Sequence, residues 1–315
     1  MEVFYDAVAG VDVHQEQLTI TTLVGNDSRN LKKTTWECKT FTSDLIEAGK
    51  KIKSLGVTQV AMESSGVYWR PVFNIWSNMG IVITLGNAHH IKNVPGRKTD
   101  KKDSEWLASL HRNGLIRASY IPAEEFRKLR DLTRHRSNLM NDITDVKNRF
   151  QKVLEEGNVK LQSVVSDVFG VAGRKVMNAI INGEKDPSEL AKLVDTNVKA
   201  KKEVILKSLE NRLSETNVFL LKQLYSQLLY LEQLHLELEY EISDKMKPYE
   251  TQIKQLDEIP GIDVKTAQII IAEATTEMAT FKDAKSFAAW AGVAPGNNES
   301  AGKKKGPKLE KEIPL

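Results

Sequence analysis

Three β-rich runs open the chain, and helix-like and strand-like patterns then alternate up to residue 85. The strands are recognised by residues that alternate with a period of two and by clusters of Val, Ile and Thr. The helices are recognised by apolar residues three or four apart and by a glycine at their end. A chain that alternates in this way is expected to fold as an α/β domain. The expected strands are 8–13, 18–24, 36–41, 57–62 and 81–85, and the expected helices are 43–55 and 69–79.

The order of these elements is compatible with two architectures. Three consecutive strands followed by alternating helices and strands are expected of an RNase H-like fold, and one half of an actin-like kinase has the same order. Such a kinase needs a Gly-rich phosphate-binding loop after its first strand, and Val13-His14-Gln15-Glu16 does not supply one. The element order leaves both architectures open, and the missing loop argues against the kinase.

The rest of the chain has the pattern of helices. Apolar residues three, four or seven apart over 123–156 predict one amphipathic helix, and a looser helical stretch follows up to residue 200. Leucines repeated over 206–242 predict a long helix of coiled-coil type, which Pro248 ends. This helix could pair within the chain as a helical hairpin or form a dimer seam. We therefore expect an α/β domain with its basic helix at 1–156, a helical linker and coiled coil at 157–250, and a mainly helical C-terminal domain at 251–315.

Composition is that of an ordinary soluble protein from a reducing compartment. Hydrophobic residues make up 41% of the chain and charged residues 28%. The single Cys38 excludes an internal disulfide framework and a Cys-based zinc site. No apolar run approaches the roughly 18 residues that a membrane helix needs, and the first residues lack the features of a secretory signal. We expect a cytoplasmic protein with no membrane partner. Its net charge of +3 does not by itself indicate a nucleic-acid binder.

Four carboxylates stand out by position. Asp12 lies inside the first strand between apolar residues, and Glu63 ends a later strand. Asp100 and Asp103 are three residues apart at a helix start, so both point to one face. Clustered carboxylates repel one another unless a hard cation neutralises them. Two Mg²⁺ ions, or Mn²⁺ in their place, would do so and would hold the attacking and leaving oxygens of a phosphodiester. Taken alone, each acid is more simply a helix cap or a surface charge.

Three longer patterns surround these acids. They are Gly-Val-Asp-Val-His at 10–14, Met-Glu-Ser-Ser-Gly-Val-Tyr-Trp at 62–69, and the stretch 90–107 that contains Lys-Thr-Asp-Lys-Lys-Asp-Ser-Glu-Trp. Together they resemble the DEDD transposases of the IS-one-ten family, and the similarity covers nearly the whole chain. The resemblance implies an RNase H-like (RuvC-like) domain whose metal site is formed by Asp12, Glu63, Asp100 and Asp103. It also implies a guide RNA that selects DNA by base pairing, and a site assembled from several protomers of a dimer or tetramer.

A Pro-Gly turn marks the C-terminal domain. Residues 256–263 and 266–273 have the pattern of helix, tight turn and helix, which resembles a helix-hairpin-helix element. The turn amides and the second helix start of such an element hold a DNA phosphate. Asp263 stands where a second glycine is usual, so it could cap the helix but would repel a phosphate. A purely structural turn is the alternative.

A polar loop follows a helix that we expect over 281–290, and it contains Ser300-Ala301-Gly302-Lys303. A serine there is ordinarily just a loop residue, but DEDD transposases have a Ser-x-Gly-Lys element at this point. The resemblance implies that Ser300 is the nucleophile that attacks DNA, with nearby lysines stabilising the alkoxide and holding the phosphate. Family members continue into further helices that the last residues here do not resemble. We therefore expect an incomplete C-terminal domain.

Basic residues cluster beside the acids, beside Ser300 and along the helix at 123–156. They are expected to contact a nucleic-acid backbone; the alternative is a solvated face on which they pair with acids such as Glu124, Asp131 or Asp145. The expected contacts are Lys92, Arg97, Lys98, Lys101, Lys102, Arg127, Arg130, Arg134, Lys303, Lys304 and Lys305.

Three functions follow from these patterns and from what the resemblance implies. The first is a transposase that cuts and rejoins DNA at insertion-sequence ends with the four acids and Ser300. The second is a RuvC-like nuclease that uses the acids alone, so that its cleavage survives the loss of Ser300. The third is an inactive, truncated remnant that still binds nucleic acid, with a strong dependence on salt.

Overall fold

The computed structural model describes residues 3–26, 30–64, 66–88, 91, 103–194 and 200–292, and the backbone of 299–300 and 303–304. The chain divides into two compact units. The first comprises Met1–Ile121 with Phe281–Leu315, and the second is Pro122–Thr280. The basic helix that we expected to belong to the N-terminal domain lies in the second unit, because its apolar face packs on helices that come later in the chain.

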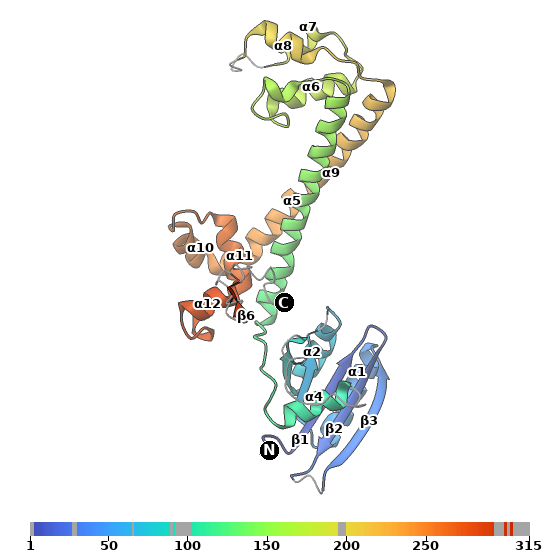
Figure 1. The fold of residues 1–315 in the computed structure, drawn as a ribbon, viewed down its shortest axis with the longest axis vertical. Helices are drawn as coiled ribbons and strands as arrows, with labels where there is room; N and C mark the ends of the chain where they lie inside the picture. The colour runs from blue at the N-terminus through green and yellow to red at the C-terminus, as the bar shows by residue number, and fades with distance from the viewer. Residues whose placement is uncertain are drawn as a thin grey trace. The chain divides into compact units, whose positions relative to one another are not determined.

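The first unit is built on a five-stranded mixed sheet in the order β3-β2-β1-β4-β5 (Figure 1). β1 pairs antiparallel with β2 and parallel with β4, β2 pairs antiparallel with β3, and β4 pairs parallel with β5. The predicted α/β character is confirmed, but the third strand was predicted too far along the chain. It pairs with the whole of β2, and this partner sets its length. The strands are β1 Ala7–Val13, β2 Gln17–Val24, β3 Lys32–Lys39, β4 Gln59–Glu63 and β5 Val82–Gly86.

One face of the sheet is apolar and is covered by α1 (Thr42–Ser54) and α2 (Trp69–Asn78). Val11 and Met62 of the sheet, both fully buried, belong to this core together with Trp76 of α2. The Trp76 indole nitrogen donates to the Leu45 carbonyl oxygen at 2.7 Å, so α2 is tied to α1. The opposite face is covered by α4 (Asp103–Arg112). α1 begins at Thr42, one residue before the start that we predicted, and its N-cap, Phe41, makes no side-chain hydrogen bond.

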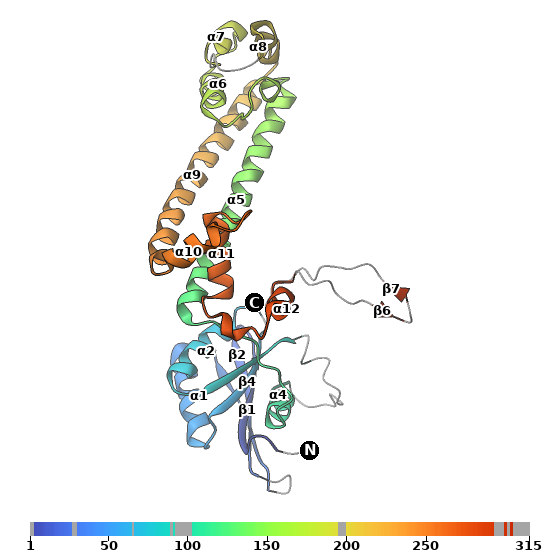
Figure 2. The ribbon, with the colours of Figure 1, turned by 90° about the vertical axis from the view of Figure 1, so that its left-hand side faces the viewer.

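The second unit is built on two long antiparallel helices, α5 (Glu124–Glu156) and α9 (Glu215–Met246), which lie side by side (Figure 2). Their far ends are joined by short helices, whose apolar residues form one core with Phe150 of α5 and Leu228 of α9. Of the two pairings expected for the leucine-rich helix, the hairpin within the chain is present. The connecting elements are η1 Leu161–Ser163, α6 Val171–Ile181, α7 Pro187–Lys192 and α8 Lys202–Leu209.

The leucine-rich helix begins later than we predicted. α8 ends at Leu209, and α9 starts afresh after Ser214, whose hydroxyl accepts from the Asn217 amide at 3.1 Å. The Asn217 side chain in turn accepts from the Ser214 amide at 3.0 Å, which completes a capping box. Reciprocal caps of this kind start a helix, and so the periodicity of leucines from residue 206 onward spans two helices.

The C-terminal helices complete the second unit and lead out of it. α10 and α11 pack against the near ends of α5 and α9 through a core that includes Phe126, Ile242 and Ile271. α12 begins three residues later than we predicted, because Asp283 caps it by accepting from the Ser286 amide at 2.7 Å. Among the described helices, none combines the length and the apolar character needed to cross a membrane. The remaining elements are η2 Lys247–Tyr249, α10 Glu250–Asp257, α11 Val264–Ala274, η3 Met278–Thr280, α12 Ala284–Trp290, β6 Glu299–Ser300 and β7 Lys303–Lys304.

Candidate functional site

Two of the predicted acids lie at the same end of neighbouring parallel strands. Val11 of β1 pairs with Met62 of β4, and Asp12 and Glu63 are the next residues of the two strands. Because side chains alternate along a strand, and Val11 and Met62 are buried in the core under α1 and α2, the two carboxylates face the opposite side of the sheet. Both acids are partly exposed there.

Gly10 allows α4 to lie directly on this side of the sheet. A Cβ atom at Gly10 would lie 2.1 Å from the Ser104 carbonyl oxygen and 2.2 Å from the Ala108 amide nitrogen, which is closer than real Cβ contacts. Gly10 is two residues before Asp12 and therefore lies on the same side of the sheet. The helix backbone thus takes the place of a side chain beside the first acid.

The direction of α4 carries Asp103 toward the other two acids. The Arg112 carbonyl oxygen, at the end of α4, accepts from the amides of Phe4 and Tyr5 at 2.9 and 3.2 Å, and these residues precede β1. α4 therefore runs antiparallel to β1, with its start toward the end of the strand that carries Asp12 (Figure 1). Asp12, Glu63 and Asp103 thus approach one end of one sheet face from three different elements.

A chain of hydroxyl groups holds the first turn of α4. Thr21 of β2, which pairs with Gly10, lies 2.8 Å from the Ser104 hydroxyl and 3.0 Å from the Thr35 hydroxyl, oxygen to oxygen. The side chains of Thr21 and Ser104 are both fully buried. On the next residue of the helix, the Glu105 carboxylate accepts from the Lys33 ammonium at 3.0 Å. Sequence reasoning missed this support, although a run of Thr in a strand that faces a helix was a usable signal.

Asp12 has one partner that the sequence did not reveal. The His14 Nε2 atom lies 3.1 Å from an Asp12 carboxylate oxygen. The Asp12 side chain is 29% exposed and that of His14 is 64% exposed, so solvent reaches the pair. Carboxylate oxygens are ligands that Mg²⁺ and Mn²⁺ accept. In the part of the chain that the structure describes, no three His, Cys, Asp or Glu side chains are close enough together to hold a metal ion, and Asp100 lies outside that part.

The serine loop is described only by its backbone. Glu299–Ser300 and Lys303–Lys304 form a two-stranded antiparallel pair, in which Ser300 is the partner of Lys303. The short pair therefore brings the predicted nucleophile and one predicted phosphate contact into register. The predicted site residues outside the described part of the chain are Lys92, Arg97, Lys98, Asp100, Lys101, Lys102 and Lys305.

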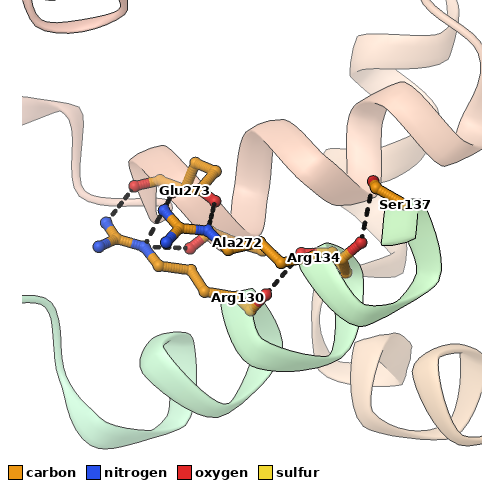
Figure 3. Close-up of polar contacts among 6 residues, drawn as sticks. Arg130, Arg134, Ser137, Ala272 and Glu273 are labelled. Carbon is orange, nitrogen blue, oxygen red and sulfur yellow. Dashed lines mark hydrogen bonds and ion pairs between the residues drawn. The ribbon is translucent and has the colours of Figure 1, made fainter. Parts of the chain in front are cut away.

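Two arginines of α5 have protein partners where we expected DNA. Arg130 is 8% exposed, and its Nε atom donates to the Ala272 carbonyl oxygen at 3.0 Å and lies 3.3 Å from the Glu273 carboxylate. Arg134 donates to both Glu273 carboxylate oxygens, at 2.7 and 2.9 Å. Figure 3 shows both guanidinium groups converging on Glu273. This carboxylate raises the pKa of Arg134 above its ordinary value through the hydrogen bond between them. The burial of Arg130 leaves no surface on which a phosphate could replace these partners.

A third arginine of α5 also binds α11. Arg136, 3% exposed, donates to the Gln268 side-chain oxygen at 2.6 Å and to the Lys265 carbonyl oxygen at 3.1 Å. Arg127, another predicted DNA contact, is half-buried on the same helix. The basic face of α5 therefore serves, at Arg130, Arg134 and Arg136, to hold the C-terminal helices of the second unit.

Asp263 caps α11, as the sequence indicated that it could. Its carboxylate accepts from the Thr266 amide at 2.8 Å, and hydrogen bonds from Thr266 lower the pKa of Asp263. Gly261, with a φ of 90°, has the left-handed conformation that favours glycine in the turn before it.

Residues 9–158 match a family model described as "Transposase", and residues 253–313 match one described as "Transposase IS116/IS110/IS902 family". The first range contains the four predicted acids and the second contains Ser300. Among curated proteins, no relative is similar enough to match. The chain therefore belongs to the IS110 family of transposases.

Proposed function

We propose that this transposase cuts and rejoins DNA at insertion-sequence ends, with Asp12, Glu63, Asp100 and Asp103 as a site for divalent cations and Ser300 as the nucleophile. The observation that carries the proposal is the placement of Asp12 and Glu63 side by side at the ends of β1 and β4, with the start of α4 directed toward them. The sheet order also supports an RNase H-like (RuvC-like) domain.

The donor set fits a hard divalent cation. Asp12, Glu63 and Asp103 offer only carboxylate oxygens, and like charges at one end of a sheet are costly unless a cation neutralises them. When bound, Mg²⁺ or Mn²⁺ would stabilise negative charge on the oxygens of a phosphodiester. Asp12 and Glu63 would hold the ions from the sheet, while Asp103 and Asp100 would do so from α4 and the residues before it. His14 would orient the Asp12 carboxylate through their 3.1 Å contact.

Ser300 would supply the covalent step. Its hydroxyl oxygen forms a bond to the phosphorus of the scissile phosphodiester as the bond to the departing sugar oxygen breaks. The serine loses its proton to solvent, and the departing oxygen takes one up. The pairing of Ser300 with Lys303 supports a role for that lysine in stabilising the charge on the phosphate. A phosphoserine linkage preserves the energy of the phosphodiester, which allows the strand to be rejoined.

The nucleic-acid surface that we propose is smaller than the one expected from the sequence. It keeps the basic residues beside the acids and beside Ser300, and it leaves out Arg130 and Arg134, which are engaged by Glu273. Contacts of this kind bind the backbone and carry little base specificity. Delegating the choice of DNA to a guide RNA, as the family resemblance implies, suits such a surface. A dimer or tetramer would allow the acids and Ser300 of different protomers to share one site.

A covalent-adduct assay tests this proposal. The purified protein, with RNA co-expressed from its own element, is incubated with Mg²⁺ and DNA that carries the element ends, and protein–DNA linkage is followed on denaturing gels. We expect an adduct from the native protein, and none from Ser300→Ala or Asp12→Asn. Glu47→Gln is the matched control, because Glu47 is exposed on α1, on the opposite side of the sheet. Its adduct should form at the native rate.

Two results would contradict the proposal. Mg²⁺-dependent cleavage that persists in Ser300→Ala without an adduct would show a RuvC-like nuclease that uses the acids alone. Binding of nucleic acid without any cleavage would show a non-catalytic protein.

A further inference from the structure

We propose that the buried hydroxyl pair Thr21–Ser104 positions Asp103 at the start of α4, and that the affinity of the site for divalent cations depends on it. The inference deepens the proposed function and rests on it. The acid motifs and the serine motif do not by themselves predict a role for Thr21 or Ser104.

The hydroxyl pair acts at the right place on the helix. Ser104 directly follows Asp103, and its hydroxyl lies 2.8 Å from that of Thr21 in the middle of β2. Both side chains are fully buried, so water does not compete for the contact. The Thr21 hydroxyl also lies 3.0 Å from that of Thr35 on β3. A hydrogen bond is directional, and this one therefore sets the rotation of the first turn about the helix axis.

The other contacts of α4 do not set that rotation as closely. Gly10 admits the helix backbone at van der Waals distance but offers no directional partner. The apolar contacts of Ala108 with Val8 and Leu23 lie one turn further along the helix. The ion pair between Glu105 and Lys33 involves a lysine side chain that is 51% exposed, so it tolerates movement. Of these contacts, the hydroxyl pair constrains the rotation of the turn that carries Asp103 most closely.

Cation affinity is sensitive to such orientation. The carboxylates must be brought together against their mutual repulsion before an ion is bound. A hydrogen bond that already holds one carboxylate in place reduces the free energy that ion binding must spend on ordering the ligands. Changes to groups that orient metal ligands typically weaken metal affinity by about 10- to 100-fold.

Variants of Thr21 separate hydrogen bonding from packing. Thr21→Val keeps the volume and loses the hydroxyl, whereas Thr21→Ser keeps the hydroxyl and loses a methyl group. Thr35→Val is the matched control. It removes the other hydroxyl that contacts Thr21 but leaves the Thr21–Ser104 contact intact. Ser104→Ala removes the contact from the helix side and tests the inference should Thr21→Val fail to fold.

The measurement is a calorimetric titration of each protein with Mn²⁺ in the absence of nucleic acid. We expect Thr21→Val and Ser104→Ala to bind Mn²⁺ about tenfold more weakly than the native protein. Thr21→Ser and Thr35→Val should stay within about twofold of native. In metal-free protein, the amides of residues 103–108 should exchange with solvent faster in Thr21→Val than in Thr35→Val.

The outcomes distinguish this inference from the proposed function. Native Mn²⁺ affinity in Thr21→Val and Ser104→Ala would overturn the inference alone, as would a larger loss in Thr21→Ser than in Thr21→Val, which would indicate packing. A native protein that does not bind Mn²⁺, or an Asp12→Asn variant that binds it as the native protein does, would overturn the proposed metal site and the inference with it.

Discussion

Small or uncharged residues lie where α4 contacts the side of the sheet that carries Asp12. Gly10 allows the α4 backbone to approach the sheet, and the hydroxyl groups of Thr21 and Ser104 are hydrogen-bonded to each other. The opposite side is filled by large apolar residues such as Trp76. Burying a polar group is costly unless it is hydrogen-bonded, and burying a charge costs more. His111 of α4 is a case in which the charged form is disfavoured.

His111 should make folding sensitive to pH. It is 3% exposed and lies beside the Tyr5 ring, with a centroid distance of 5.0 Å and the two ring planes tilted by 41°. Its Nε2 atom has no hydrogen-bond partner among the described residues. Burial lowers the pKa of His111 to about 4. The unfolded chain, with a pKa near 6.5, therefore binds the proton more readily than the folded one. Above pH ~6.5 the neutral His111 therefore does not lower the free energy of unfolding. As the pH falls toward about 4, that free energy should decrease by on the order of 2 kcal/mol.

Denaturation in urea at a series of pH values, followed by tryptophan fluorescence, measures this effect. All five tryptophans of the chain lie in the unit that contains His111. His111→Phe keeps an aromatic ring beside Tyr5 and removes the titration, so its unfolding free energy should fall less between pH 6.5 and 4.5. Parallel pH profiles for the two proteins would show that His111 does not contribute.

At the scale of elements, several helices begin at a side-chain cap that the chain places just before an apolar run. Ser214 starts α9, Asp263 starts α11 and Asp283 starts α12, each by accepting a backbone N–H bond. Such caps satisfy amides that have no partner within the helix. They also explain why leucine periodicity alone extended the long helix too far toward the N-terminus.

Asp263 should contribute to stability as a cap. Asp263→Ala removes the acceptor of the Thr266 amide and should lower the unfolding free energy of the second unit by about 1 kcal/mol. Asp263→Asn keeps an equivalent cap and should change it by only a few tenths of a kcal/mol, on the order of experimental error. Helical circular dichroism during urea denaturation gives both values. Equal losses in the two variants would show that the charge of Asp263, rather than its capping bond, is what stabilises α11.

At the scale of the whole molecule, polar contacts join segments that are far apart in the sequence. Arg130 and Arg134 bind Glu273, which is 143 and 139 residues away in the sequence, and Arg136 binds Gln268, which is 132 residues away. These contacts hold α11 on α5 beside the apolar core that contains Phe126 and Ile271. The last residues of α11 are thereby held where the chain leaves toward α12 and the serine loop.

Loss of Glu273 should destabilise the second unit strongly. Glu273→Ala leaves the buried Arg130 guanidinium without its carboxylate partner, which we expect to cost about 3 kcal/mol. The loss should appear in helical circular dichroism and not in tryptophan fluorescence, because the second unit contains no tryptophan. Glu277→Ala, four residues on and exposed, is the control and should unfold as the native protein does. Equal stability of the two variants would contradict a structural role for the arginine–glutamate contacts.

Much of the fold was predictable from the sequence because its signals are local. The period of two in β1 and β2, and the period of three or four in α5, depend on neighbouring residues that bury one face of one element. The order of strand-Asp12, strand-Glu63 and helix-Asp103 was also readable, since each motif lies within a single element. The bounds of β3 were not, because a strand extends as far as its partner allows.

The sequence by itself determined the strands, the long helix α5, the positions of the acids on them, and the family to which the chain belongs. The tertiary structure alone decided which faces meet. It placed α4 on Gly10, with the Ser104 hydroxyl beside that of Thr21. It also paired Arg130 and Arg134 with Glu273, although the local sequence pattern predicted that they contact DNA. A side chain's periodicity is set by its neighbours along the chain, whereas its partner is set by the packing of elements that can be more than a hundred residues apart.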